Sequence, residues 1–132
     1  MLVRRLAEAP VEEWHKLRTH VLMDAGELGS RNMSVTWIDV PPGIDQELHS
    51  HEESEQVYVI SSGSGTMTVA GDTQEITAGD LVMVPPATDH SIANDGSSDL
   101  CCVSVQSPPV TVSEVYAPTA AAGASEFDEE EY

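Results

Sequence analysis

Short runs in which apolar and polar residues alternate, separated by glycine and proline turns, constrain the fold of this chain most strongly. Met33, Val35 and Trp37 alternate with serine and threonine until a turn at 41–43 ends the run. Further short strand-like runs follow at 56–60, 65–70, 73–77, 81–84, 90–93, 99–106 and 110–116, and all but the last end at turns containing Gly or Pro. Many short strands divided in this way predict an all-β sandwich or barrel.

The N-terminal segment shows a different period. Val11, Trp14 and Leu17 recur at intervals of three, as the buried stripe of a helix does. Pro10 suits the first position of a helix, because that position needs no backbone N–H. The sequence therefore predicts one short helix at 9–17, ahead of the strands.

Length and composition indicate one folded domain followed by a tail. A chain of 132 residues allows a single domain, which can bury a real core without a metal or disulfide to hold it together. We predict that residues 1–116 form this domain. The stretch 117–132 is rich in alanine and acidic residues and lacks the apolar surface that would offset the entropy of ordering it, so we expect disorder there.

The charge of the chain excludes several classes of partner. Lys and Arg number 5 against 23 Asp and Glu, which gives a formal net charge of -18. Nucleic acids and anionic membrane surfaces both require a cationic face, so we expect neither as a partner. No apolar run approaches the roughly 20 residues of a membrane span, and acidic residues follow the N-terminus from Glu8 onward in place of an apolar signal region. These features predict a cytoplasmic protein.

Three histidines in two separate segments suggest a metal site. His49 and His51 flank one serine, and residues at i and i+2 of a strand point to the same face. Glu55 and Gln56 begin the next strand, and His90 follows a third strand and a double-proline turn. All of these side chains could enter one barrel mouth, where imidazoles from two segments would share a cation.

The spacing of these residues resembles the two motifs of the cupin superfamily. The first motif matches Gly43, which is followed after five residues by His49-Ser50-His51 and then by Glu55-Gln56 and Gly63. The second motif matches Gly79, which is followed after five residues by Pro85-Pro86-Ala87, after two more by His90 and after three more by Asn94. Only the second glycine of the second motif differs, because Ala87 takes its place. The resemblance covers roughly 31–116. It implies a double-stranded β-helix (a jelly-roll barrel), often dimeric, with a divalent metal in its mouth.

The third protein ligand is ambiguous in the sequence. The family normally has Glu, and six residues separate this ligand from Gly63, which selects Gln56 here. If Gln56 points inward, so does Tyr58; if Glu55 points inward, valines line the site instead. We favour Gln56 and keep Glu55 as the alternative. With Gln56 all four ligands are neutral, which makes a stronger Lewis acid that attracts anions, whereas an iron oxygenase of the two-His-one-carboxylate kind needs Glu55.

Two further residues are candidates for catalysis. Tyr58 would act as a proton donor if it faces the metal, and is otherwise a packing residue. Arg31 would bind a substrate carboxylate with two hydrogen bonds, and is otherwise a surface residue beside a turn. The metal is expected to be one divalent ion per chain, Zn, Mn, Fe, Ni or Cu, because imidazole suits all of them.

These features predict a metal-dependent enzyme acting on a small polar or anionic metabolite. The His, His, Gln and His set looks like that of the pectin-degradation cupins that linearise unsaturated uronates, which implies isomerisation, tautomerisation or decarboxylation through a metal-stabilised enediolate. A quercetinase-like dioxygenase and a non-catalytic sugar-binding or small-molecule-binding cupin remain as alternatives. We expect a homodimer, as the resemblance implies.

Overall fold

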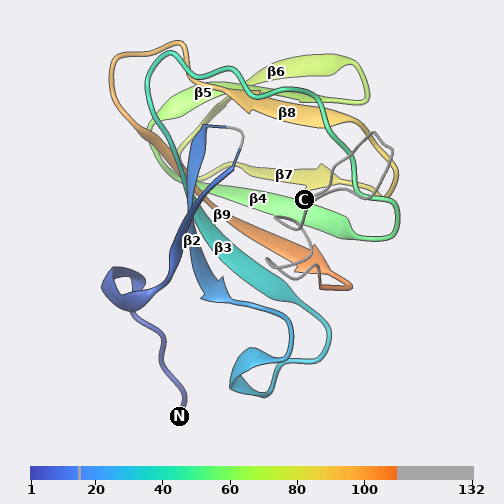
Figure 1. Ribbon diagram of the computed structural model, residues 1–132. Coiled ribbons are helices and arrows are strands. Elements are labelled where there is room, and N and C mark those ends of the chain that lie inside the picture. The colour runs from blue at the N-terminus through green and yellow to red at the C-terminus, as the bar shows by residue number, and fades with distance from the viewer. Residues whose placement is uncertain (15, 110–132) are drawn as a thin grey trace.

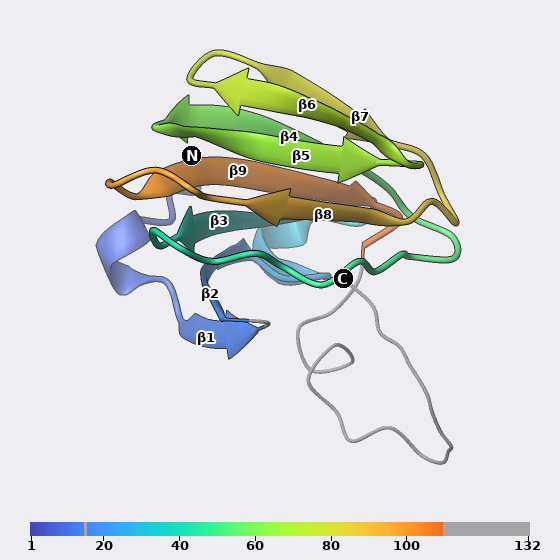
Figure 2. The same cartoon turned by 90° about the horizontal axis from the view of Figure 1, so that it is seen from above.

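The protein is built from two antiparallel β-sheets that face each other (Figures 1 and 2). The computed structural model describes residues 1–14 and 16–109. The larger sheet has the strand order β1-β2-β3-β9-β4-β7, and the smaller has β6-β5-β8. The strands are β1 (Val11–Trp14), β2 (Leu17–Met23), β3 (Ser34–Val40), β4 (Glu55–Ser62), β5 (Ser64–Val69), β6 (Asp72–Thr77), β7 (Leu81–Val84), β8 (His90–Ala93) and β9 (Leu100–Ser107).

The predicted all-β architecture is confirmed. The strands expected from 33 to 106 all form, with ends that shift by a few residues. Their buried positions alternate along β3, β4 and β9, as the alternation in the sequence requires. The strand expected at 110–116 and the tail at 117–132 lie outside the described residues.

The helix predicted at 9–17 is wrong. Trp14 and Leu17 instead pair across the hairpin of β1 and β2, and Lys16 adopts the positive φ of 67° that the tight turn requires. Val11, the third residue of the supposed stripe, is exposed. Strand pairing overrides the local pattern because β2 also pairs with β3 over its length. The nearest helical element is a single 3-10 turn at Leu6–Glu8, and no helix in the described ranges is long and apolar enough to cross a membrane.

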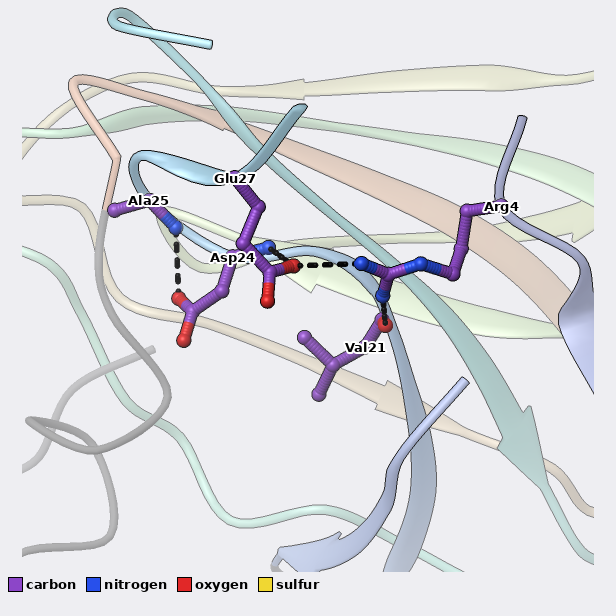
Figure 3. A network of polar contacts seen from close by, with 5 residues as sticks. All are labelled: Arg4, Val21, Asp24, Ala25 and Glu27. Carbon is purple, nitrogen blue, oxygen red and sulfur yellow. Dashed lines mark hydrogen bonds and ion pairs between the residues drawn. The ribbon is translucent and has the colours of Figure 1, made fainter. Parts of the chain in front are cut away.

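The N-terminal segment is held against the turn that follows β2 (Figure 3). The guanidinium of Arg4 donates to the carbonyl of Val21 at 3.3 Å and pairs with Oε1 of Glu27 at 3.2 Å. The same carboxylate oxygen accepts the backbone N–H of Asp24 at 2.9 Å. These contacts tie the segment before β1 to β2 and to the turn that follows it.

The segment between β3 and β4 runs alongside β8 and extends the smaller sheet. The backbone N–H of Gln46 donates to the carbonyl of Ile92 at 3.0 Å. His49 and His90 exchange two backbone hydrogen bonds, of 3.1 and 2.9 Å, and form a β-bridge. Two histidines that are far apart in the sequence therefore lie directly opposite each other.

The inward face of the larger sheet changes from apolar to polar along its strands. At one end, Val40 and Leu100 lie opposite each other and are fully buried. At the other end the cross-strand rows are polar: Ser34, Gln106 and Gln56 form one row, and Thr36, Ser104 and Tyr58 form the next. All six of these side chains are buried. The core is therefore apolar at one end and lined with hydrogen-bonding groups at the other.

Candidate metal centre

Three buried imidazoles converge at the polar end of the barrel. His49, His51 and His90 each offer a ring nitrogen, and these atoms all lie within 4.8 Å of one another. The ring centroids are 4.2 Å apart for His49 and His90, 5.1 Å for His51 and His90, and 5.5 Å for His49 and His51. Three histidine nitrogens this close together match the ligand set of a transition-metal site.

Backbone carbonyls orient two of these rings. Nδ1 of His49 lies 3.1 Å from the carbonyl of Glu47, and Nδ1 of His90 lies 3.0 Å from the carbonyl of Thr88. A carbonyl can only accept, so Nδ1 carries the proton in each ring. The lone pair of a neutral ring is then on Nε2, which is how metal-binding histidines are held in the correct tautomer.

Gln56 completes the group of inward-pointing acceptors. Its Oε1 lies 2.9 Å from Nε2 of His51 and 3.1 Å from Nε2 of His90, while its Nε2 donates to Oγ of Ser104 at 2.6 Å. Because the proton of a neutral His90 is on Nδ1, its Nε2 and Oε1 of Gln56 face each other as two acceptors. A cation between them would remove this repulsion. The donor set therefore fits a divalent ion.

Burial keeps His51 and His90 neutral. Desolvation, together with the neighbouring His90, lowers the pKa of His51 to about 3, against the opposing effect of its hydrogen bond with Gln56. Burial also lowers the pKa of His90, although its hydrogen bond to Thr88 and the charge of Asp89 oppose this effect. Near neutral pH these imidazoles keep their lone pairs available for a metal.

The structure separates the two candidates for the third ligand. Buried and exposed positions alternate at the start of β4, so Gln56 is 1% exposed while Glu55 faces outward. Tyr58 shares the inward face with Gln56, and its ring centroid lies 6.1 Å from that of His90. Arg31 is exposed in the turn before β3 and is not among the residues gathered around the imidazoles. Its catalytic role stays a prediction, as does that of Tyr58.

The second sequence motif holds the histidine loops together. Ala87, which stands where the family has glycine, has a positive φ of 58° and donates its N–H to the carbonyl of His51 at 2.6 Å. Asn94 is 1% exposed, and its side chain donates to the carbonyls of Val40 and Ser98, both at 2.8 Å. This asparagine fixes the loop after β8.

Two features of the site were not recognised in the sequence. Trp14 of β1 packs edge-on against His49, with the ring centroids 5.0 Å apart, although its spacing had suggested a helical stripe. Ser104 and Gln106 line the interior next to Gln56. The alternation in β9 could have revealed Ser104 and Gln106. Its inward positions begin with the apolar Leu100 and become polar toward the site.

Comparison with known proteins agrees with this geometry. The family model described as a cupin domain matches residues 36–106. A *Thermotoga maritima* protein named as oxalate-binding is 31% identical over 96 residues, which cover 73% of this chain and 74% of that protein. An uncharacterised protein of *Methanocaldococcus jannaschii* is 39% identical over 70 residues, which cover 53% of this chain but only 56% of that protein's length.

Solved structures show the same barrel. The crystal structure of a *Thermotoga maritima* protein described as a predicted oxalate decarboxylase superposes with a TM-score of 0.74 at 25% identity, covering 81% of this chain and 99% of that one. KdgF from *Halomonas* superposes with a TM-score of 0.70 over 83% of this chain and 96% of that one, and at 15% identity it shows the fold alone. The barrel, the three histidines and the matched family model establish that this chain belongs to the cupin family.

Proposed function

We propose that this chain is a metal-dependent cupin enzyme acting on a small, oxygen-rich anion. One observation carries the proposal: the inward ligand set is buried and entirely neutral, with three imidazoles and the Gln56 amide. His49, His51, Gln56 and His90 would hold one divalent ion per chain, Zn, Mn, Fe, Ni or Cu. Its charge would not be compensated by the protein, so it would bind anions and stabilise negative charge on their oxygens.

The reaction class follows from the residues around this centre. An isomerisation or tautomerisation next to a carboxylate passes through an enediolate-like species, and a decarboxylation leaves an electron pair on the carbon that loses carbon dioxide. Both need charge stabilisation and a proton donor. Tyr58 is the candidate for moving the proton, because it is buried on the same face of β4 as Gln56 and lies beside His90. The polar rows that end at Gln56 and Tyr58 suit a hydrophilic substrate better than the apolar ring of a quercetinase-like substrate.

The relatives support a carboxylate ligand. The *Thermotoga maritima* protein is named for binding oxalate, and the similar structure from that organism is described as a predicted oxalate decarboxylase. Both names concern a small dicarboxylate. The first also favours a second candidate function, in which the protein binds the anion without converting it.

Metal binding is the first test. Trp14 packs against His49, so its fluorescence should be quenched when Cu²⁺ or Ni²⁺ is added to metal-free protein. Trp14→Phe, which retains Trp37, is the control that assigns the signal to the site. Elemental analysis should find one ion per chain after Zn, Mn, Fe, Ni or Cu is offered. A protein that takes up none of these ions would overturn the proposal.

Turnover then separates the candidate functions. In one assay the metal-loaded protein is given small dicarboxylates and 2-oxo acids, and the release of carbon dioxide is measured. In a second assay it is given unsaturated uronates, and the loss of their ultraviolet absorbance is measured. We expect conversion of one of these classes. Tyr58→Phe should reduce kcat strongly and change KM little. Binding without conversion would favour the non-catalytic candidate, and oxygen consumption with a flavonol would favour the dioxygenase.

A further inference from the structure

Gln106 is a buried amide that neither the metal centre nor the hydrophobic core uses. It is 2% exposed on the inward face of β9. In the larger sheet it lies directly opposite Gln56 of β4 on one side and Ser34 of β3 on the other. Residues opposite each other on neighbouring antiparallel strands have Cβ atoms about 4.5–5.5 Å apart. The Cβ atom of Gln106 therefore lies next to that of Gln56, whose side chain faces the histidines.

The amide nitrogen of Gln106 lacks a partner. Within residues 1–14 and 16–109, its Nε2 is fully buried and makes no hydrogen bond. The other buried glutamines differ: Nε2 of Gln56 donates to Ser104 at 2.6 Å, and Oε1 of Gln46 accepts the N–H of Ile92 at 3.3 Å. A buried donor without an acceptor is unfavourable, so such a group is expected to meet its partner in another molecule.

The surroundings of Gln106 favour an anionic partner. Its neighbours in the two polar rows are hydroxyl, amide and phenol side chains, and none carries a negative charge: Ser34, Thr36, Gln56, Tyr58 and Ser104. An oxygen anion would therefore meet a donor here without meeting a carboxylate. This absence of charge is notable in a chain with a net charge of -18.

We propose that Gln106 is a ligand-recognition residue whose Nε2–H donates to one oxygen of an anion, while another oxygen of the same anion binds the ion held by the histidines and Gln56. This inference rests on the proposed function and deepens it by naming the ligand class. Two anchoring points on neighbouring strands select small anions that carry at least two oxygen groups. Dicarboxylates of the oxalate type and 2-oxo or 2-hydroxy acids belong to this class.

The experiment compares two anions on metal-loaded protein by calorimetric titration. Oxalate has oxygens for both anchoring points, whereas azide occupies a metal position through one end atom and offers no carboxylate oxygen. Gln106→Met keeps the length of the side chain and removes the donor. We expect it to weaken oxalate binding about ten- to hundredfold, since a hydrogen bond to a charged group is lost. Azide binding and metal content should not change.

Two further variants keep the result interpretable. Gln106→Glu has nearly the shape of the native residue and should weaken oxalate binding at least as much, because a carboxylate then faces the anion. Gln46→Met removes a buried glutamine amide away from the polar rows and should leave oxalate affinity unchanged. Thermal melting of each variant shows whether it is folded at the temperature of the titration.

The outcomes distinguish this inference from the function on which it rests. Equal oxalate affinity in wild type and Gln106→Met would overturn the role of Gln106 while leaving the metal centre intact, as expected if an ordered water satisfies the amide. A loaded wild-type protein that binds azide but no dicarboxylate, 2-oxo acid or 2-hydroxy acid would overturn the ligand class. Failure to bind any metal would overturn the proposed function and this inference together.

Discussion

At the scale of single residues, the most consequential choice lies between two adjacent side chains. Gln56 is buried against His51 and His90, whereas Glu55 is exposed on the other face of β4. Replacing Gln56 by Ala removes an inward oxygen, so metal affinity should fall by at least about tenfold. Glu55→Ala should leave it unchanged. Competition with a chromophoric chelator measures both affinities, and loss of metal only in Glu55→Ala would reverse the assignment.

A second residue-scale prediction concerns the alanine in the second motif. Ala87 has a φ of 58°, a region that costs a non-glycine residue roughly 1–2 kcal/mol. Glycine relieves this strain but loses more entropy on folding, so Ala87→Gly should raise the free energy of unfolding by about 0.5–1 kcal/mol. Ala93→Gly, at the paired C-terminal residue of β8, should lower it. Urea denaturation of the two variants checks the opposite signs.

At the scale of elements, the close packing of β5 against its neighbours depends on one glycine. A Cβ at Gly65 would collide with the carbonyl oxygen of Ala93 and lie 2.7 Å from Cδ2 of Leu100. Gly65→Ala should therefore destabilise the protein by about 1–3 kcal/mol. Gly71→Ala is the comparison, because its Cβ meets open space and only its φ of 83° opposes the change. If Gly71→Ala proved the more damaging in thermal melts, steric contact would not explain Gly65.

A cluster on the outer face joins β2, β3 and β9. Asp39 accepts hydrogen bonds from Trp37 at 3.0 Å and Cys101 at 3.1 Å, and its other oxygen lies 2.9 Å from Nε2 of His20. Burial raises the pKa of Asp39, but the contacts with His20, Cys101 and Trp37 outweigh it, so the pKa falls below 3.8.

The lowered pKa of Asp39 predicts how stability depends on pH. The ionised carboxylate stabilises the fold above its unfolded-state pKa of 3.8, and this contribution is lost as the pH falls through the lower folded-state value. Asp39→Asn should therefore be less stable than wild type at pH 5–7. The difference should shrink below about pH 4. Denaturation curves across this range test the prediction, and a constant difference would contradict it.

At the scale of the whole molecule, the outer face of the larger sheet carries a group of apolar side chains. Two cross-strand rows lie on this face: Val35, Val105, Val57 and Met83 form one, and Trp37, Val103, Val59 and Leu81 form the other. Leu81 is 61% exposed, Met83 43% and Val59 38%. Neither row contains a charge; the acidic residues of this face, Asp39 and Glu55, lie beyond the two rows.

We propose that this face forms the interface of a homodimer, because a twofold axis brings the same patch of both copies together and would bury these apolar side chains. Val59→Glu should convert the protein to a monomer while metal content stays the same. Val11→Glu, also at an exposed valine but on the edge strand β1, should leave the dimer intact. Light scattering after gel filtration gives the mass of each. A monomeric wild type would exclude this interface.

The sequence alone determined the strands from β3 to β9 and most of the candidate metal centre. Alternation reports which residues share a side of a strand, and this information is local. It grouped Gln56 with Tyr58, and the spacing to Gly63 implied by the cupin resemblance favoured this pair as the inward side. The two histidine segments were also recognisable, since their motifs keep a fixed spacing along the chain.

The tertiary structure alone decided what surrounds that centre. Apolar residues at intervals of three in 9–17 are compatible with a helix. In the structure this segment is a hairpin instead, because β2 pairs with β3, and the hairpin places Trp14 against His49. The position of Gln106 beside Gln56 depends on how β9 aligns with β4, two strands that are distant in the chain. Pairing between distant strands depends on the packing of the whole barrel, and no local pattern encodes it.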